Sequence, residues 1–171
     1  WESAQGRNPG AVTNWDESLQ WMQSETPTEG TMGGAQNQMD YYGTYARDDG
    51  DFDYPDGAYG VMSWWDYGHW ITVEGERIPN ANPFQQGAQP AADFLLAPNE
   101  TQSNDVLASQ SETGEETRYV MVDWKMATPG TADSKFSAPI VFYDAQNVSS
   151  EDFTQRVYTS DLRGSTVLNK Q

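Results

Sequence analysis

Residues 64–68, Trp-Trp-Asp-Tyr-Gly, combine hydrogen-bond donors and an acceptor in one short run. The indole N–H groups of Trp64 and Trp65 only donate, and the ionised carboxylate of Asp66 only accepts. Two adjacent tryptophans do not both fit one core face, so we expect at least one to line a surface pocket or an interface. Two donors beside one acceptor suit a small group that both donates and accepts, such as an alcohol hydroxyl. Two core tryptophans beside a turn aspartate are an equally compatible interpretation.

The acidic segment 48–56 is a second candidate site, because its aspartates alternate as calcium ligands do. Asp49, Asp51 and Asp53 occupy positions 1, 3 and 5 of an EF-hand frame. Position 6 is Tyr54 instead of glycine and position 12 is Gly60 instead of glutamate, which excludes an EF-hand. Looser cation binding and a solvated acidic loop both remain open.

Hydrolytic chemistry finds little support in the residue types. His69 is the single histidine, the chain has no cysteine, and neither Gly-x-Ser-x-Gly nor a glycine-rich phosphate loop occurs. A carboxylate pair acting on a glycoside remains compatible, because 26 acidic residues always allow pairs. No spacing selects one pair over the others.

The 171-residue chain has 26 acidic and 9 basic residues, which gives a formal charge of −17. Aromatic residues reach 13%, which is typical of a folded domain and not of a disordered acidic tail. The charge repels phosphate groups and therefore excludes nucleic acid and acidic membrane surfaces as partners. Many acids with few lysines are typical of salt-adapted proteins, and an ordinary acidic secreted domain is the alternative.

Hydrophobic spacing predicts the elements that position these residues. Trp15, Leu19 and Met22 share one face of a helix that is capped at Asn14 and ends before Pro27. Further predicted elements are an irregular loop at 30–57, strands at 59–63, 118–124 and 136–143, and helices at 67–73, 91–97, 101–111 and 150–157. This mixture, with neither an internal repeat nor a domain boundary, predicts a single α+β domain over residues 1–171.

The pentapeptide at 64–68 resembles the WWDYG signature of the catalytic subunits of oligosaccharyltransferases, which N-glycosylate proteins. The similarity extends over most of residues 15–143, including 61–63 before the motif and the predicted strand at 119–122. With its acidic composition, the chain resembles the C-terminal globular domain of a haloarchaeal member of this family.

The resemblance implies a role for each residue of the motif. In this family the Trp-Trp-Asp residues bind the serine or threonine hydroxyl at the +2 position of the acceptor sequon Asn-X-Ser/Thr. Carried over, Trp64 and Trp65 donate through their indole N–H groups and Asp66 accepts the hydroxyl proton. Tyr67 and Gly68 would shape the turn. A substrate without the hydroxyl would leave buried polar groups unpaired, which favours such discrimination.

A second family element, the DK motif, lies beside the Trp-Trp-Asp pocket. It places a lysine three residues after an aspartate, and a methionine or isoleucine four residues further on. Lys135 followed by Phe136 resembles this motif, but Asp133 is only two residues before the lysine and Pro139 replaces the methionine or isoleucine. The resemblance favours Lys135 with Asp133. The segment 123–126 is a rival placement, and plain surface charges are a third interpretation.

The resemblance also implies partners that lie outside this chain. In the family, a transmembrane region and its external loops hold the divalent cation, Mn²⁺ or Mg²⁺, and the lipid-linked oligosaccharide. No apolar run here approaches the roughly 18 residues of a membrane span, and the chain begins at Trp1. We therefore expect a piece of a longer membrane protein, inactive by itself and without metal or catalytic residues, on the extracytoplasmic side. Sequons at Asn99 and Asn147 are compatible with that side.

Two other functions remain open from the residues alone. A carbohydrate-binding module would use the seven tryptophans and nine tyrosines, since sugars stack on aromatic rings. A calcium-stabilised surface-layer module would use the aspartates of 48–56. The first alternative needs exposed rings along a sugar chain, whereas an oligosaccharyltransferase domain needs a hydroxyl-bearing peptide beside Asp66.

Overall fold

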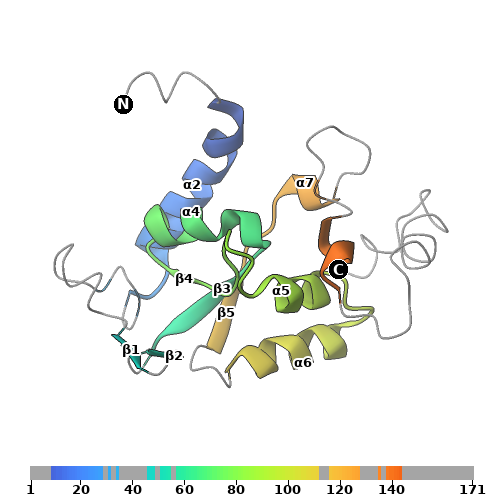
Figure 1. The fold of residues 1–171 in the computed structure, drawn as a ribbon. Helices are drawn as coiled ribbons and strands as arrows, with labels where there is room; N and C mark the ends of the chain where they lie inside the picture. Colours follow the sequence, from blue (N-terminus) through green and yellow to red (C-terminus); the bar gives the residue numbers. More distant parts are fainter. Residues whose placement is uncertain are drawn as a thin grey trace.

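A three-stranded parallel sheet lies among the helices of the computed structural model (Figure 1). The structure describes residues 9–28, 31, 34, 46–48, 51–54, 57–111, 116–127, 135 and 138–143. The strand order is β4-β3-β5, formed by β4 (Ile78–Pro79), β3 (Tyr59–Met62) and β5 (Glu116–Val120). Helices combined with this small sheet confirm the predicted α+β class.

The central strand β3 is buried along its whole length, as its uninterrupted apolar run predicts. Its parallel neighbours require crossover connections, because a tight turn cannot join parallel strands. The first crossover contains η2 (Trp65–Tyr67) and α4 (Gly68–Val73), and the second contains α5 (Ala88–Leu95) and α6 (Glu100–Ser111). The helices predicted at 67–73, 91–97 and 101–111 are therefore confirmed, with α5 beginning earlier than expected because its first turn tolerates a proline.

Helix α2 (Pro9–Glu25) packs on the sheet with the face that its spacing predicts. The three residues of that face are buried: Trp15, Leu19 and Met22. The helix ends before the Thr-Pro pair, since the residue before proline is disfavoured in a helix. The predicted cap at Asn14 is wrong, because the helix already begins at Pro9, and a proline fits a first helical position.

Strand β5 is shorter than the strand predicted at 118–124. It stops at Val120, and α7 (Trp124–Ala127) follows shortly afterwards. The Asp123 Oδ1 atom accepts the backbone N–H of Lys125 at 3.2 Å, which caps this helix. The residues after Val120 therefore lead into a capped helix and do not extend the strand.

The strand predicted at 136–143 is wrong. Among its described residues, η3 (Ala138–Val141) forms a helical turn. Pro139 has no N–H to donate to a strand ladder, which opposes a strand at this position. The helix predicted at 150–157 lies outside the described residues.

The acidic segment contains a pair of strands, so the predicted irregular loop is wrong at these residues. Strand β1 (Ala46–Asp48) pairs antiparallel with β2 (Asp51–Asp53), and Arg47 lies opposite Phe52. In the sequence, an Asp-Gly pair lies between these two segments, and such a pair is a typical hairpin signal. The signal was overlooked because the segment is rich in aspartate and glycine, which favours an irregular loop.

Arg77 is completely buried, and no carboxylate in the described part of the chain pairs with its charge. Its guanidinium donates instead to oxygen atoms at 2.9–3.3 Å. The acceptors are the carbonyls of Met22, Gln23, Thr26, Gly75 and Glu76 and the hydroxyls of Thr26 and Tyr59. Two of these carbonyls belong to the last turn of α2, where the helix dipole favours a cation. Arg77 therefore joins the end of α2, strand β3 and the turn after α4.

Gly68, the first residue of α4, lies against the backbone that follows β4. A Cβ atom at this position would lie 2.2 Å from the carbonyl oxygen of Ala81 and 2.7 Å from the Cα of Asn82. Backbone atoms cannot yield as a flexible side chain can. The last residue of the pentapeptide is therefore a packing requirement.

We predict that Arg77→Lys lowers the free energy of unfolding by about 3 kcal/mol, because an ammonium reaches fewer of these oxygens and leaves buried carbonyls unpaired. Arg118→Lys is the matched control, since Arg118 is exposed on β5 and its ion pair with Glu116 should contribute at most about 1 kcal/mol. Urea denaturation followed by circular dichroism measures both variants. Equal losses in the two variants would contradict a special role for Arg77.

We also predict that Gly68→Ala lowers the free energy of unfolding by about 2–3 kcal/mol, because α4 and the chain at 81–82 must move apart. In a chain of this length that loss lowers the melting temperature by roughly 5–10 °C. Thermal unfolding followed by circular dichroism tests this. A melting temperature equal to that of the wild type would show that the backbone relaxes without cost.

Candidate functional site

The pentapeptide begins two residues after the carboxyl end of β3. Open parallel sheets bind ligands outside the carboxyl ends of their strands. Trp64 is extended (φ −64°, ψ 140°), and the chain then turns in η2, which carries Trp65 and Asp66. Trp64 is buried, whereas the side chains of the next two residues are partly buried. The central strand therefore presents these three residues at the edge of the sheet where ligands usually bind.

The two indoles lie against each other, and a phenylalanine packs edge-on against both. The ring centroids of Trp64 and Trp65 are 5.9 Å apart, and the Phe142 ring is 5.6 Å from the first and 6.1 Å from the second. Phe142 follows η3, so a segment distant in the sequence covers the tryptophan pair. Sequence reasoning missed this contact, because it treated 136–143 as a strand.

Three successive residues each carry a buried polar atom that has no hydrogen-bond partner in the described part of the chain: Trp64 Nε1, Trp65 Nε1 and Asp66 Oδ2. Ser63 Oγ and Asn80 Nδ2 are also unpartnered. Native proteins pair nearly all buried polar groups, and an unpaired group costs about 1–3 kcal/mol. Two N–H donors and one carboxylate oxygen within one turn can therefore bind a ligand that both donates and accepts.

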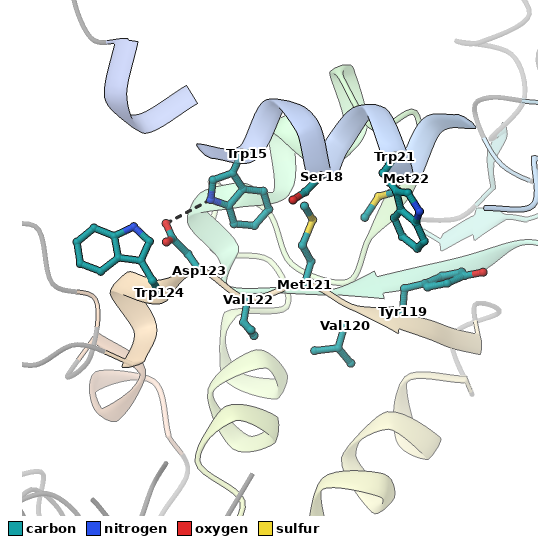
Figure 2. Close-up of a pocket in the computed structure, with 10 residues that line it drawn as sticks. All are labelled: Trp15, Ser18, Trp21, Met22, Tyr119, Val120, Met121, Val122, Asp123 and Trp124. Atoms are coloured by element: carbon teal, nitrogen blue, oxygen red, sulfur yellow. Dashed lines mark hydrogen bonds between the residues drawn. The ribbon is translucent and has the colours of Figure 1, made fainter. Parts of the chain in front are cut away.

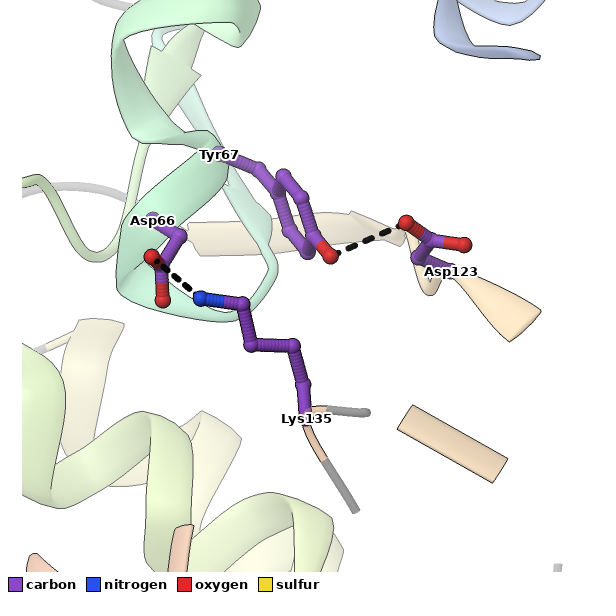
Figure 3. Close-up of polar contacts among 4 residues, drawn as sticks. All are labelled: Asp66, Tyr67, Asp123 and Lys135. Carbon is purple, nitrogen blue, oxygen red and sulfur yellow. Dashed lines mark hydrogen bonds and ion pairs between the residues drawn. The ribbon is translucent and has the colours of Figure 1, made fainter. Parts of the chain in front are cut away.

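Lys135 lies on one side of this site (Figure 3). Its Nζ donates to Asp66 Oδ1 at 2.8 Å, and the Lys135 and Asp66 side chains are 34% and 25% exposed. The ion pair occupies one carboxylate oxygen and leaves Oδ2 without a partner. Asp133, which the sequence pairs with Lys135, lies outside the described residues.

Tyr67 is held by a residue that follows β5 (Figure 3). Its hydroxyl donates to Asp123 Oδ2 at 2.9 Å. Its ring stacks on Trp15 of α2 with the centroids 4.3 Å apart, and the Trp15 indole N–H also donates to Asp123 Oδ2, at 3.2 Å. Burial, followed by the hydrogen bond to Asp123, raises the pKa of Tyr67 above its ordinary value, so its hydroxyl remains a donor. From the sequence, Asp123 was interpreted only as part of the rival DK-motif placement at 123–126. The signal that could have revealed its contacts is an aspartate inside an otherwise apolar stretch.

A groove of about 480 Å³ lies between α2 and β5 (Figure 2). Its walls are mainly apolar and aromatic side chains of the helix, the strand and the residues after it, among them Trp21, Met121 and Trp124. Trp15 and Asp123 also line the groove, whereas the Trp-Trp-Asp residues do not. The groove and the predicted site are therefore separate surfaces. Tyr67 links them, because it contacts both Trp15 and Asp123 of the groove.

Other candidate features can be placed as well. Asn99, the first predicted sequon, is exposed and accepts the Gln102 backbone N–H at 3.0 Å, which caps α6, and Asn147 lies outside the described residues. Within the residues described above, no group of three or more His, Cys, Asp or Glu side chains could hold a metal ion. The described helices include none with the length and apolar character needed to cross a membrane.

Comparison with known proteins gives one consistent family. Residues 12–127 match the AglB core domain. The dolichyl-monophosphooligosaccharide–protein glycotransferase AglB of Haloferax volcanii is 62% identical over 158 residues, which cover 91% of this chain and 15% of that protein.

Solved oligosaccharyltransferase structures from Archaeoglobus fulgidus share the fold. The complex with an inhibitory peptide and a dolichol-phosphate has a TM-score of 0.61 and 33% identity, covering 77% of this chain and 15% of that chain. The complex with Zn and sulfate has a TM-score of 0.64 and 31% identity, covering 82% and 17%. The form tethered through a disulfide bond to an acceptor peptide containing the NVT sequon has a TM-score of 0.59 and 34% identity, covering 75% and 14%.

This chain is much shorter than the relatives that it matches. The chain spans 15% of the length of the Haloferax relative, so the comparison describes this domain and not a whole enzyme. The family match nevertheless covers most of the described residues, including the pentapeptide. The chain therefore belongs to the AglB core domain family of archaeal oligosaccharyltransferases.

Proposed function

We propose that this chain is the acceptor-recognition domain of an oligosaccharyltransferase, in which Trp64, Trp65 and Asp66 bind the serine or threonine hydroxyl of the sequon Asn-X-Ser/Thr. The observation that carries the proposal is the set of unpartnered polar atoms on these three residues. Family membership supports it, since a solved relative is tethered to an acceptor peptide with an NVT sequon. It also favours this function over a carbohydrate-binding or surface-layer module.

A hydroxyl group matches both kinds of unpartnered atom. Its oxygen accepts from an indole N–H, and its hydrogen is donated to Asp66 Oδ2. A valine of similar shape offers neither, and each polar group then left unpaired costs about 1–3 kcal/mol. Sites built to hydrogen-bond a hydroxyl therefore reject an analogue without it far more strongly than an apolar pocket rejects a missing methylene.

Lys135 would assist this recognition by orienting the carboxylate. The contact from its Nζ to Asp66 Oδ1 restrains rotation of the carboxylate and leaves Oδ2 for the acceptor hydroxyl. This contact makes Lys135 the described residue best placed to act as the lysine of the DK motif. The pairing of Lys135 with Asp133 stays a prediction.

The chemistry of transfer would take place outside this chain. Other parts of a longer membrane protein would bind the lipid-linked oligosaccharide and the divalent cation, Mn²⁺ or Mg²⁺. One solved relative is in complex with a dolichol-phosphate, and another was crystallised with Zn and sulfate. The described residues do not gather three potential metal ligands, so no step is assigned to a metal here. In this proposal the domain faces the extracytoplasmic side and does not transfer glycans by itself.

We predict that Asp66→Ala in the full-length protein lowers kcat/KM for an Asn-X-Thr peptide at least about 100-fold, because the hydroxyl loses its acceptor. Transfer from the lipid-linked donor to Asn-X-Thr and Asn-X-Val peptides is measured in parallel. Asp105→Ala, an exposed acid on α6, is the matched control and should behave as the wild type. Unchanged selectivity for threonine over valine in Asp66→Ala would overturn the proposed function.

We predict a smaller effect for Lys135→Met, a loss of about tenfold in kcat/KM for the Asn-X-Thr peptide, which corresponds to one charged hydrogen bond of roughly 1.4 kcal/mol. The variant keeps Asp66 as an acceptor, so threonine should still be preferred to valine. Lys125→Met is the matched control, because the nearby Lys125 makes no ion pair with a described residue. Equal rates for Lys135→Met and the control would show that the ion pair does not assist recognition.

A further inference from the structure

We propose, on the basis of the proposed function, that Asp123 is a positioning residue, which sets the geometry of the acceptor site by holding Tyr67 against Trp15. The hydrogen bonds of Asp123 within the described part of the chain go to Trp15, Tyr67 and Lys125 and not to the Trp-Trp-Asp residues, so its effect would pass through Tyr67 and through α7.

The side chains of η2 need an anchor from outside the turn. This helical turn contains only three residues, and its N-cap residue, Trp64, makes no side-chain cap hydrogen bond. Two backbone bonds close the turn, one from Tyr67 N to Trp64 O at 3.0 Å and one from Gly68 N to Trp65 O. These bonds hold the backbone but do not fix the orientation of the side chains, which must present polar atoms to the same ligand group.

Tyr67 provides this anchor. Tyr67 follows Asp66 directly and points away from it into the core (Figure 3). Its ring packs against Trp15 and Trp70, with centroids at 4.3 and 5.7 Å, and its hydroxyl is fixed by Asp123 at 2.9 Å. Ring contacts and a directed hydrogen bond together fix both the position and the rotation of the Tyr67 side chain. The peptide that joins it to Asp66 is thereby fixed too.

The carboxylate of Asp123 is buried, and both of its oxygens accept hydrogen bonds. Oδ2 accepts from the Tyr67 hydroxyl and from the Trp15 indole, and Oδ1 accepts from the Lys125 backbone N–H. Three donors offset the cost of burying the charge. An apolar replacement would leave all three donors unpaired, and an asparagine has only one oxygen for them.

Asp123 also supports the opposite side of Asp66. It caps α7, and the carbonyl of Lys125 in that helix accepts the backbone N–H of Lys135 at 3.0 Å. Lys135 in turn forms the ion pair with Asp66. Asp123 therefore acts on both neighbours of the Asp66 carboxylate, the next residue in the chain and the cationic partner.

The test uses the full-length protein with Tyr67→Phe, Asp123→Asn and the double variant, and measures kcat, KM for an Asn-X-Thr peptide and the melting temperature. Tyr67→Phe removes one hydroxyl and keeps the ring stacking, so it remains informative if Asp123→Asn does not fold. We expect each single variant to raise KM about tenfold with kcat within about twofold of wild type. The double variant should match the weaker-binding single variant, because both remove the same contact. Asp105→Asn is the matched control.

A merely structural role predicts a lower melting temperature with an unchanged KM, and that result overturns the proposal. If the double variant raises KM by the product of the two single effects, Tyr67 and Asp123 do not act through one shared contact. Asp66→Ala in the same assay separates the two levels of inference. If Asp66→Ala loses threonine selectivity while Tyr67→Phe keeps the wild-type KM, the positioning role fails and the proposed function stands. If Asp66→Ala keeps its selectivity, the proposed function itself fails.

Discussion

The buried guanidinium of Arg77 is the interaction on which the rest of the structure depends. No described carboxylate balances its charge, so carbonyl and hydroxyl oxygens from α2, β3 and the turn after α4 must do so together. Burying an ion is costly unless hydrogen bonds surround it, and these oxygens surround it only in the folded arrangement. The constraint fixes the end of α2 against the sheet, and α2 in turn brings Trp15 to the pentapeptide.

The Trp-Trp-Asp residues are therefore supported by the surrounding fold although they occupy a short turn. Strand β3 carries them to the carboxyl edge of the sheet, and two contacts from distant segments restrain Asp66 on either side: Lys135 pairs with its carboxylate, and Asp123 holds the neighbouring Tyr67. The supporting groups on Arg77 and Asp123 are hydrogen-bonded, whereas Trp64 Nε1, Trp65 Nε1 and Asp66 Oδ2 have no partner among the described residues. Such a contrast is expected of a site whose hydrogen bonds are completed by a substrate.

Local sequence patterns predicted the secondary structure correctly where apolar residues followed a clear spacing or formed an uninterrupted run. The spacing of Trp15, Leu19 and Met22 predicted the buried face of α2, and the apolar run at 59–63 predicted the central strand. The predictions were wrong where a proline acts against the surrounding pattern. Pro139 opposed a strand in an otherwise strand-like stretch, and a predicted cap at Asn14 was overridden because Pro9 begins the helix earlier.

By itself, the sequence determined the α+β class and the buried central strand, and it selected Trp-Trp-Asp as a candidate site, because these depend on residue type and short spacing. Only the tertiary structure decided that Lys135 pairs with Asp66, that Phe142 covers the indoles and that Asp123 holds both Tyr67 and Trp15. Those contacts join residues 69, 78, 56 and 108 positions apart. Their partners are selected by the packing of the whole sheet and its helices, which no local pattern of residues encodes.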